Sequence, residues 1–204
     1  MNYYSQFGED KIIEEYFGKD YVGGCIDVGA SNGVSISNTL GFEENGWYCL
    51  CIEPNPMYFN DLKQNRSNAV EYAISNRNDE MIFKIVNLGN NIEDAVSALT
   101  LDKKLLDQFD AGGWPIKITP ILVKTITLDN CIEQFYKYDT IDFISIDTEG
   151  TELDVLKGFS IQKWNPKLLV IENNWGDPDI EIYLELFGYK KHKRLEINDF
   201  YIKK

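Results

Sequence analysis

Acidic residues recur in this sequence where runs of apolar residues end. Asp27 lies near the end of the run VGGCIDVGA (22–30), and Glu53 is the last residue of WYCLCIE (47–53). Asp147 and Glu149 lie at the end of TIDFISIDTEG (140–150), and Glu172 lies near the end of PKLLVIENN (166–174). A carboxylate accepts hydrogen bonds from hydroxyl groups and can take up a proton. Gathered in one place, these five side chains would form a site able to bind a hydroxylated ligand and to act as a base.

The turn after the first apolar run consists of Asp27, Val28, Gly29, Ala30, Ser31, Asn32 and Gly33. Gly29 permits a tight turn and a close approach of a ligand to the backbone. We predict that a helix begins after this turn, where free amide groups favour a carboxylate or phosphate. The turn reads G-x-x-x-G and lacks the dinucleotide fingerprint G-x-G-x-x-G, which disfavours a pyrophosphate. It fits a loop around the methionine part of S-adenosylmethionine, although a purely structural turn is the alternative.

Glu53 follows Gly29 by 24 residues and is succeeded by Pro54. An acid at the end of the second strand can accept both hydroxyls of a ribose. Hydrogen bonds to a charged acceptor contribute about 1.5–3 kcal/mol each. In the same layout Ala73, Ile74 and Ser75 would lie beside an adenine ring, although they are equally compatible with an ordinary strand.

Apolar runs alternate with amphipathic segments along most of the chain. We predict strands at 22–30, 47–53, 68–75, 81–86, 117–126, 140–150 and 166–174, with two more in the tail. We predict helices at 9–18, 33–45, 56–67, 129–137, 151–159 and 177–189, and a loop or short helix at 87–115. Continuous apolar strands separated by helices indicate a mainly parallel sheet with helices on both faces. Ligands of such sheets bind beyond the carboxyl ends of the strands, where the acids lie.

Composition narrows the choice of partners. The 204 residues include 33 acidic and 20 basic side chains, a formal charge of −13. Nucleic acid is therefore not expected as a partner, because its binding depends on Lys and Arg. The four cysteines form no C-x-x-C pair, so zinc is not expected, and Cys25, Cys49 and Cys51 in the apolar runs fit a core. With no signal peptide and no membrane-spanning apolar run, we expect one cytoplasmic domain over residues 1–204.

The chain resembles the FkbM family of S-adenosylmethionine-dependent methyltransferases. The resemblance is carried by IDVGASNG, IEPNP, AIS, TLD, IDTEGTELDVLKG and LVIENN, with SQFGEDKII as a lead-in, and covers most of residues 5–175. It implies a Rossmann-like class I methyltransferase fold, whose seven-stranded sheet has an antiparallel last strand. It also implies O-methylation, often of a sugar hydroxyl, so a small-molecule or glycan acceptor is expected. Residues 1–20 would form a lead-in helix and 87–125 a less regular insertion near the acceptor.

Methyl transfer to oxygen requires an aligned hydroxyl and a group that takes its proton. The candidates are Asp147, Glu149, Glu152, Glu172 and Asn173, with Asp147 or Glu149 as the favoured base. Glu149 and Glu152 have a structural alternative as charges at a helix N-terminus, worth about 0.3–1 kcal/mol. In a second arrangement Asp147, Glu172 and Asn173 bind Mg²⁺ through oxygen, and the ion lowers the pKa of the hydroxyl.

Two other functions stay open at this stage. One is an oxidoreductase that binds NAD or a nucleotide sugar, which the missing pyrophosphate loop disfavours. The other is a non-catalytic module that only binds the cofactor, which the acids at the strand ends disfavour. The sequence does not indicate an oligomeric state.

Overall fold

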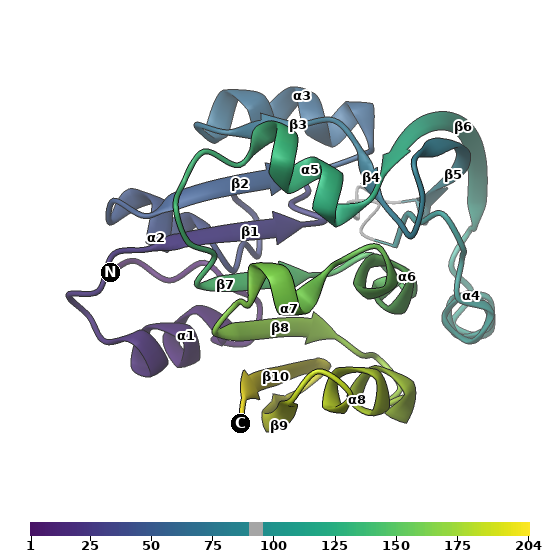
Figure 1. The fold of residues 1–204 in the computed structure, drawn as a ribbon. Coiled ribbons are helices and arrows are strands. Elements are labelled where there is room, and N and C mark those ends of the chain that lie inside the picture. The colour runs from purple at the N-terminus through teal and green to yellow at the C-terminus, as the bar shows by residue number, and fades with distance from the viewer. Residues whose placement is uncertain (90–95) are drawn as a thin grey trace.

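A computed structural model describes residues 1–89 and 96–204. Within them the main sheet has seven strands in the order β3-β2-β1-β7-β8-β10-β9. All neighbours pair in parallel except β10, which is antiparallel to both β8 and β9 (Figure 1). This order and the single reversed strand confirm the expected Rossmann-like class I methyltransferase fold. The strands are β1 (Gly24–Val28), β2 (Tyr48–Ile52), β3 (Ala69–Val70), β7 (Phe143–Ile146), β8 (Leu168–Glu172), β9 (Tyr189–Leu195) and β10 (Asn198–Lys203).

Alternate residues of the central strands enter two separate cores, as the pleat of a strand requires. In β2, Leu50 and Ile52 join the core on one face, whereas Cys49 and Cys51 join the core on the other. The first core is covered by α5 (Leu128–Phe135), α6 (Glu152–Lys157), α7 (Ile161–Trp164) and α8 (Pro178–Glu185). The second is covered by α1 (Glu9–Phe17), α2 (Leu40–Glu44) and α3 (Pro56–Asn65).

All four cysteines are free and buried, which confirms the core positions expected for Cys25, Cys49 and Cys51. Among the described helices, none combines the length and the hydrophobicity needed to cross a bilayer.

A second sheet of three strands lies beyond the carboxyl ends of β1 and β2, where the arrowheads point in Figure 1. Its order is β4-β6-β5, with β4 at Ala73–Ile74, β5 at Asp79–Asn87 and β6 at Lys117–Ile126. Helix α4 (Lys103–Ala111) precedes β6, and the Asp102 side chain caps it by accepting from two backbone N–H groups. The expected strands at 81–86 and 117–126 are confirmed, and the segment between them contains a short helix. Its residues 90–95 lie outside the described residues.

The prediction of one strand over 68–75 is wrong. The chain leaves the main sheet after β3, and β4 pairs in parallel with β6 instead. The N–H of Ser75 donates to the carbonyl of Ile126, which continues the same pairing. Residues far along the chain therefore satisfy the backbone of this segment.

The prediction of a helix over 33–45 is also wrong, because only Leu40–Glu44 is helical. Gly33 and Ile36 have φ angles of 79° and 52°, and Ser31 has 49°. A right-handed helix cannot include these left-handed residues. Residues 31–39 instead form an irregular loop that a buried ion pair holds, as described below.

Candidate active site

A cavity of about 310 Å³ opens at the carboxyl ends of β1, β2, β7 and β8. Most of the predicted site residues line it, namely Asp27, Gly29, Ala30, Ser31, Glu53, Pro54, Ala73, Ile74, Asp147, Glu149 and Glu172. The topology explains this, since parallel strands bring their carboxyl ends to one edge of the sheet. The structure thus brings together residues that are spread over 146 positions of the sequence.

The turn after β1 is held between the two neighbouring strands. The N–H groups of Gly29 and Ala30 both donate to the carbonyl of Ile52 at 3.0 Å. On the other side, a Cβ added to Gly29 would lie 1.7 Å from the carbonyl oxygen of Asp147. With its φ of 87°, Gly29 is the residue type this position requires. The turn can therefore lie directly against the end of β7.

Glu53 is buried, and each of its carboxylate oxygens accepts a hydrogen bond from a backbone N–H group. Its Oε2 accepts from the N–H of Ser31 at 2.9 Å, and its Oε1 accepts from the N–H of Asn55 at 2.8 Å. Each carboxylate oxygen retains a second lone pair for a ligand. Burial raises the pKa of Glu53 to about 7, and the two N–H groups oppose that rise. The side chain is thus fixed in position, and a donor from a ligand would favour its ionised form.

Three carboxyl groups meet at the ends of β7 and β8. One oxygen each of Asp147, Glu149 and Glu172 lies within 4.8 Å of the others. Burial, together with the negative charge of neighbouring groups, raises the pKa of Asp147 to about 7 and raises those of Glu149 and Glu172 well above their usual range. A hydrogen bond between Asp147 and Glu172 lowers the pKa of the former and raises that of the latter. Burial and mutual repulsion thus raise the pKa of all three carboxyl groups and favour their protonated forms.

Glu149 owes its position to Glu152. The Oε1 atom of Glu152 accepts from the N–H of Thr148, the hydroxyl of Thr148 and the N–H of Gly150. These bonds hold the turn in which Glu149 has a φ of 57°, a conformation that non-glycine residues rarely adopt. Strain of this kind persists only where the surroundings enforce it. Glu152 therefore has the structural role, and Glu149 lines the cavity.

Asn32, Gly33 and Ser75 lie outside the cavity lining, as do Glu152 and Asn173. The Asn32 side chain caps the loop at Val34 and Ser35, and the carbonyl of Gly33 accepts from Arg66. Ser75 pairs with β6 through its backbone, as described above. Their proposed contacts with a ligand stay predictions.

Asn173 faces away from the three carboxyl groups. Its Nδ2 donates to the carbonyl of Asp177 and to Oδ2 of Asp199, and its Oδ1 accepts from the N–H of Asp177. The predicted oxygen set of Asp147, Glu172 and Asn173 is therefore not assembled, because Asn173 bonds to the segment before α8 and to β10. Glu149 is the third acid of the cluster.

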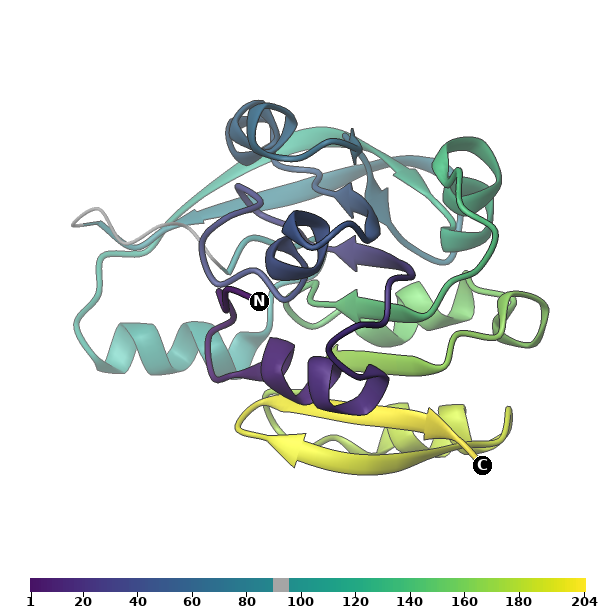
Figure 2. The same ribbon diagram turned by 90° about the vertical axis from the view of Figure 1, so that its left-hand side faces the viewer.

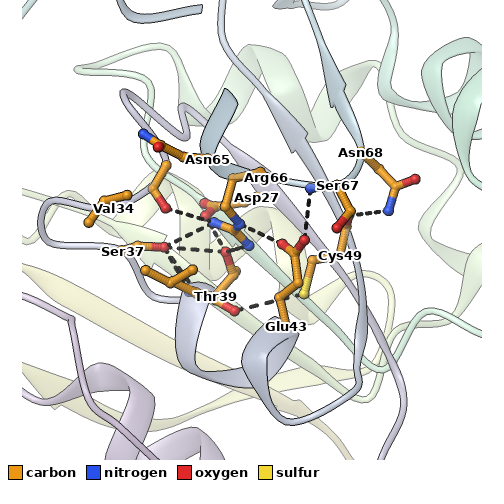
Figure 3. Close-up of polar contacts among 12 residues, drawn as sticks. Asp27, Val34, Ser37, Thr39, Glu43, Cys49, Asn65, Arg66, Ser67 and Asn68 are labelled. Carbon is orange, nitrogen blue, oxygen red and sulfur yellow. Dashed lines mark hydrogen bonds and ion pairs between the residues drawn. The ribbon is translucent and has the colours of Figure 1, made fainter. Parts of the chain in front are cut away.

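A buried cation lies beneath the turn (Figure 3). The Arg66 guanidinium donates to Oε2 of Glu43 at 2.5 Å, to the carbonyl of Gly33 at 3.1 Å and to the hydroxyl of Thr39 at 2.9 Å. The Thr39 hydroxyl in turn donates to Oδ2 of Asp27 at 2.6 Å. Burial raises the pKa of Asp27, and Arg66 and Thr39 oppose that rise. This network fixes the loop 31–39, which contributes Ser35, Ile36, Ser37 and Asn38 to the cavity wall.

Sequence reasoning missed the contribution of the N-terminal segment. Gln6 and Glu9 line the cavity, and Oε1 of Glu9 accepts from Nδ2 of Asn198 at the start of β10. Figure 2 shows α1 beside the hairpin of β9 and β10, which explains this contact. The polar segment SQFGED just before and within the first turn of a helix is the signal that could have identified it.

The insertion supplies apolar lining residues. Leu99, which precedes α4, and Leu105 of α4 line the cavity, as does Phe83 of β5 just before the insertion. This is the region in which the resemblance leads us to expect the acceptor. The specific contacts of these residues with an acceptor stay a prediction.

Replacement of Arg66 by Met tests the buried network. The substitution leaves Asp27 and Glu43 without their cation, so the free energy of unfolding is expected to fall by about 3–5 kcal/mol. Denaturant unfolding measures the change. Arg77→Met is the matched control, because the side chain of Arg77 is 59% exposed. A loss in Arg66→Met no larger than in the control would contradict the role given to the network.

The raised pKa values predict how the stability of the ligand-free protein depends on pH. The carboxyl pKa in the unfolded chain is about 4, so between that value and the folded-state values the folded protein binds more protons. Its free energy of unfolding therefore falls as the pH rises from about 4.5 through 7, by up to about 1.4 kcal/mol per unit of pKa shift. Urea titrations at several pH values measure the slope.

Glu53→Gln and Glu172→Gln are each expected to flatten this slope, because each removes a group with a raised pKa. Glu80→Gln is the control at an exposed position. The assignment fails if the two variants keep the slope of the unaltered protein.

Several solved structures are similar to this chain at low sequence identity. TrmK of M. capricolum, solved with S-adenosylhomocysteine, is 10% identical with a TM-score of 0.49; the match covers 98% of this chain and 68% of TrmK. The N-terminal domain of human METTL16 with S-adenosylhomocysteine gives 17% and 0.46, covering 95% of this chain and 65% of that one. Precorrin-6y C5,15-methyltransferase from Geobacter metallireducens gives 13% and 0.46, covering 96% and 87%.

A sequence comparison with curated proteins finds no match. Residues 27–191 match the family described as the methyltransferase FkbM domain. The match includes the turn after β1, Glu53 and the three-carboxyl cluster, and it covers more than half of the chain. The chain belongs to the FkbM methyltransferase family.

Proposed function

We propose that this protein is an S-adenosylmethionine-dependent O-methyltransferase that acts on a hydroxyl of a sugar or another small acceptor. The observation that carries the proposal is the pairing of the turn at Gly29 with the buried carboxyl group of Glu53 at one end of a single cavity. The three-carboxyl cluster lines the same cavity and supplies groups that can take a proton. Membership of the FkbM family supports methyl transfer as the reaction.

The residues present fit this cofactor. Glu53 offers lone pairs to the ribose hydroxyls, and the backbone of residues 29–31 lies beside it for the methionine part. Ala73 and Ile74 provide apolar surface in the cavity lining for the adenine. When bound, S-adenosylmethionine would supply an activated methyl group on a sulfonium, whose thioether is a good leaving group.

The protein must then place the acceptor hydroxyl and remove its proton. Asp147 is the proposed base, because its pKa of about 7 keeps an ionised fraction near neutral pH while it retains useful basicity. Oxygen atoms of Glu149 and Glu172 lie within 4.8 Å of the Asp147 carboxyl group. In this assignment the proton passes from the acceptor oxygen to the Asp147 carboxylate, and no divalent ion is required.

Calorimetry with S-adenosylhomocysteine tests the cofactor assignment. We expect the unaltered protein to bind it and to show no comparable affinity for NAD. Glu53→Ala should weaken binding at least tenfold, because it removes the proposed acceptor for the ribose hydroxyls. Glu71→Ala, at an exposed position, is the control. Unchanged affinity in Glu53→Ala would remove Glu53 from the site, and preference for NAD would favour an oxidoreductase.

Labelled methyl transfer to a panel of glycosides tests the chemistry. Asp147→Asn should lower turnover by about 100-fold or more, the effect usual for loss of a general base. The exposed Asp79→Asn is the control, and activity should persist in a chelator. Full activity of Asp147→Asn would exclude Asp147 as the base. Binding of S-adenosylhomocysteine without transfer to any hydroxyl would favour a non-catalytic module.

A further inference from the structure

One residue of the cavity lining carries a buried hydrogen-bond donor that has no partner. Among the described residues, two buried side-chain polar atoms lack one, Nδ2 of Asn55 and Oε2 of Glu172. An unsatisfied buried group costs about 1–3 kcal/mol, so such an atom in a folded protein calls for an explanation. Glu172 belongs to the proposed catalytic cluster, whereas Asn55 has no role in the assignments above.

The amide of Asn55 is held in one orientation. Asn55 is the N-cap of α3, and its Oδ1 accepts from the N–H of Met57 at 3.1 Å. The backbone N–H of Asn55 donates to Oε1 of Glu53 at 2.8 Å. Exchanging the oxygen and nitrogen of the amide would place two donors against each other at Met57, so the bonds fix which atom is Nδ2. The free donor is therefore a consequence of capping the helix.

The position of Asn55 selects the partner for this donor. Asn55 is 1% exposed and lines the cavity together with Glu53. The carboxylate of Glu53 only accepts, whereas Nδ2 only donates. A hydroxyl group satisfies both, because it can donate its proton to one atom and accept a hydrogen bond from the other. A ribose hydroxyl is the group that matches this donor and acceptor pair.

We propose that Nδ2 of Asn55 donates to a ribose hydroxyl of the cofactor, the same hydroxyl that donates to Glu53. This inference rests on the proposed function. It assigns Asn55 two tasks: its oxygen caps α3, and its nitrogen recognises the sugar. The protein then selects a ribonucleoside over a deoxyribonucleoside through one donor and one acceptor.

Two substitutions separate the tasks. Asn55→Ser and Asn55→Asp each keep an oxygen that can cap the helix but remove the donor. By calorimetry, the affinity of Asn55→Ser for S-adenosylhomocysteine is expected to fall about tenfold, as the loss of one hydrogen bond to a buried partner predicts. The serine variant should stay as stable as the unaltered protein without ligand, because the unsatisfied atom has been removed. Asn60→Ser, at an exposed position of α3, is the control.

Analogues of the ligand identify the atom that is recognised. The 2′-deoxy and 3′-deoxy analogues of S-adenosylhomocysteine are each compared with the parent compound. The unaltered protein should bind the analogue that lacks the recognised hydroxyl more weakly than the parent. In Asn55→Ser the difference in affinity between the parent and that analogue should be smaller. The proposal is overturned if Asn55→Ser binds the parent as tightly as the unaltered protein. It is also overturned if the substitution removes discrimination against a 3-deazaadenine analogue instead, which would place the donor at the ring. If the unaltered protein binds no S-adenosylhomocysteine, the proposed function itself fails.

Discussion

The site depends on the close approach of the turn after β1 to the end of β7. Gly29 allows this approach, since any side chain there would overlap the carbonyl oxygen of Asp147. The contact has two consequences. It places the backbone of residues 29–31 beside Glu53, and it brings the same turn next to the three carboxyl groups. The turn and the three carboxyl groups thus share one cavity, because the ends of β1 and β7 lie in contact.

Charge is distributed unevenly around this contact. Among the described residues that line the cavity there are six acids, Glu9, Asp27, Glu53, Asp147, Glu149 and Glu172, and no Lys, Arg or His. The buried cation, Arg66, lies beneath the loop, where it compensates Asp27 and Glu43. Such a cavity favours a ligand with positive charge, as a sulfonium has, and disfavours a phosphate or carboxylate close to these acids. The raised pKa values follow from the same arrangement, because burial and mutual repulsion oppose ionisation.

The sequence allowed most of the sheet and the acids at its edge to be predicted, because both depend on local patterns. Apolar runs identify buried strands, and the carboxyl ends of parallel strands must meet. The direction of the Asn173 side chain, away from the three carboxyl groups, could also have been predicted from the strand pattern, although the prediction placed it with them. Successive residues of a strand point to opposite faces, so a Glu172 that faces the cavity sends its neighbour away.

Other features depend on partners distant in the sequence. The helical pattern of 33–45 gives no indication that Arg66 holds its first half as a loop. The course of residues 71–75 is decided by β6, about 50 residues later along the chain. The lining contributed by Gln6 and Glu9 depends on a contact with Asn198 near the other end of the chain. Local propensity carries no information about these contacts, whereas the folded topology determines them.

A crystal structure with S-adenosylhomocysteine would test the central claim most directly. The account predicts the ribose at hydrogen-bond distance from Glu53, the amino-acid part along the turn at Gly29 and the sulfur facing the three-carboxyl cluster. A ligand bound outside this cavity, or bound in it with the ribose away from Glu53, would contradict the account.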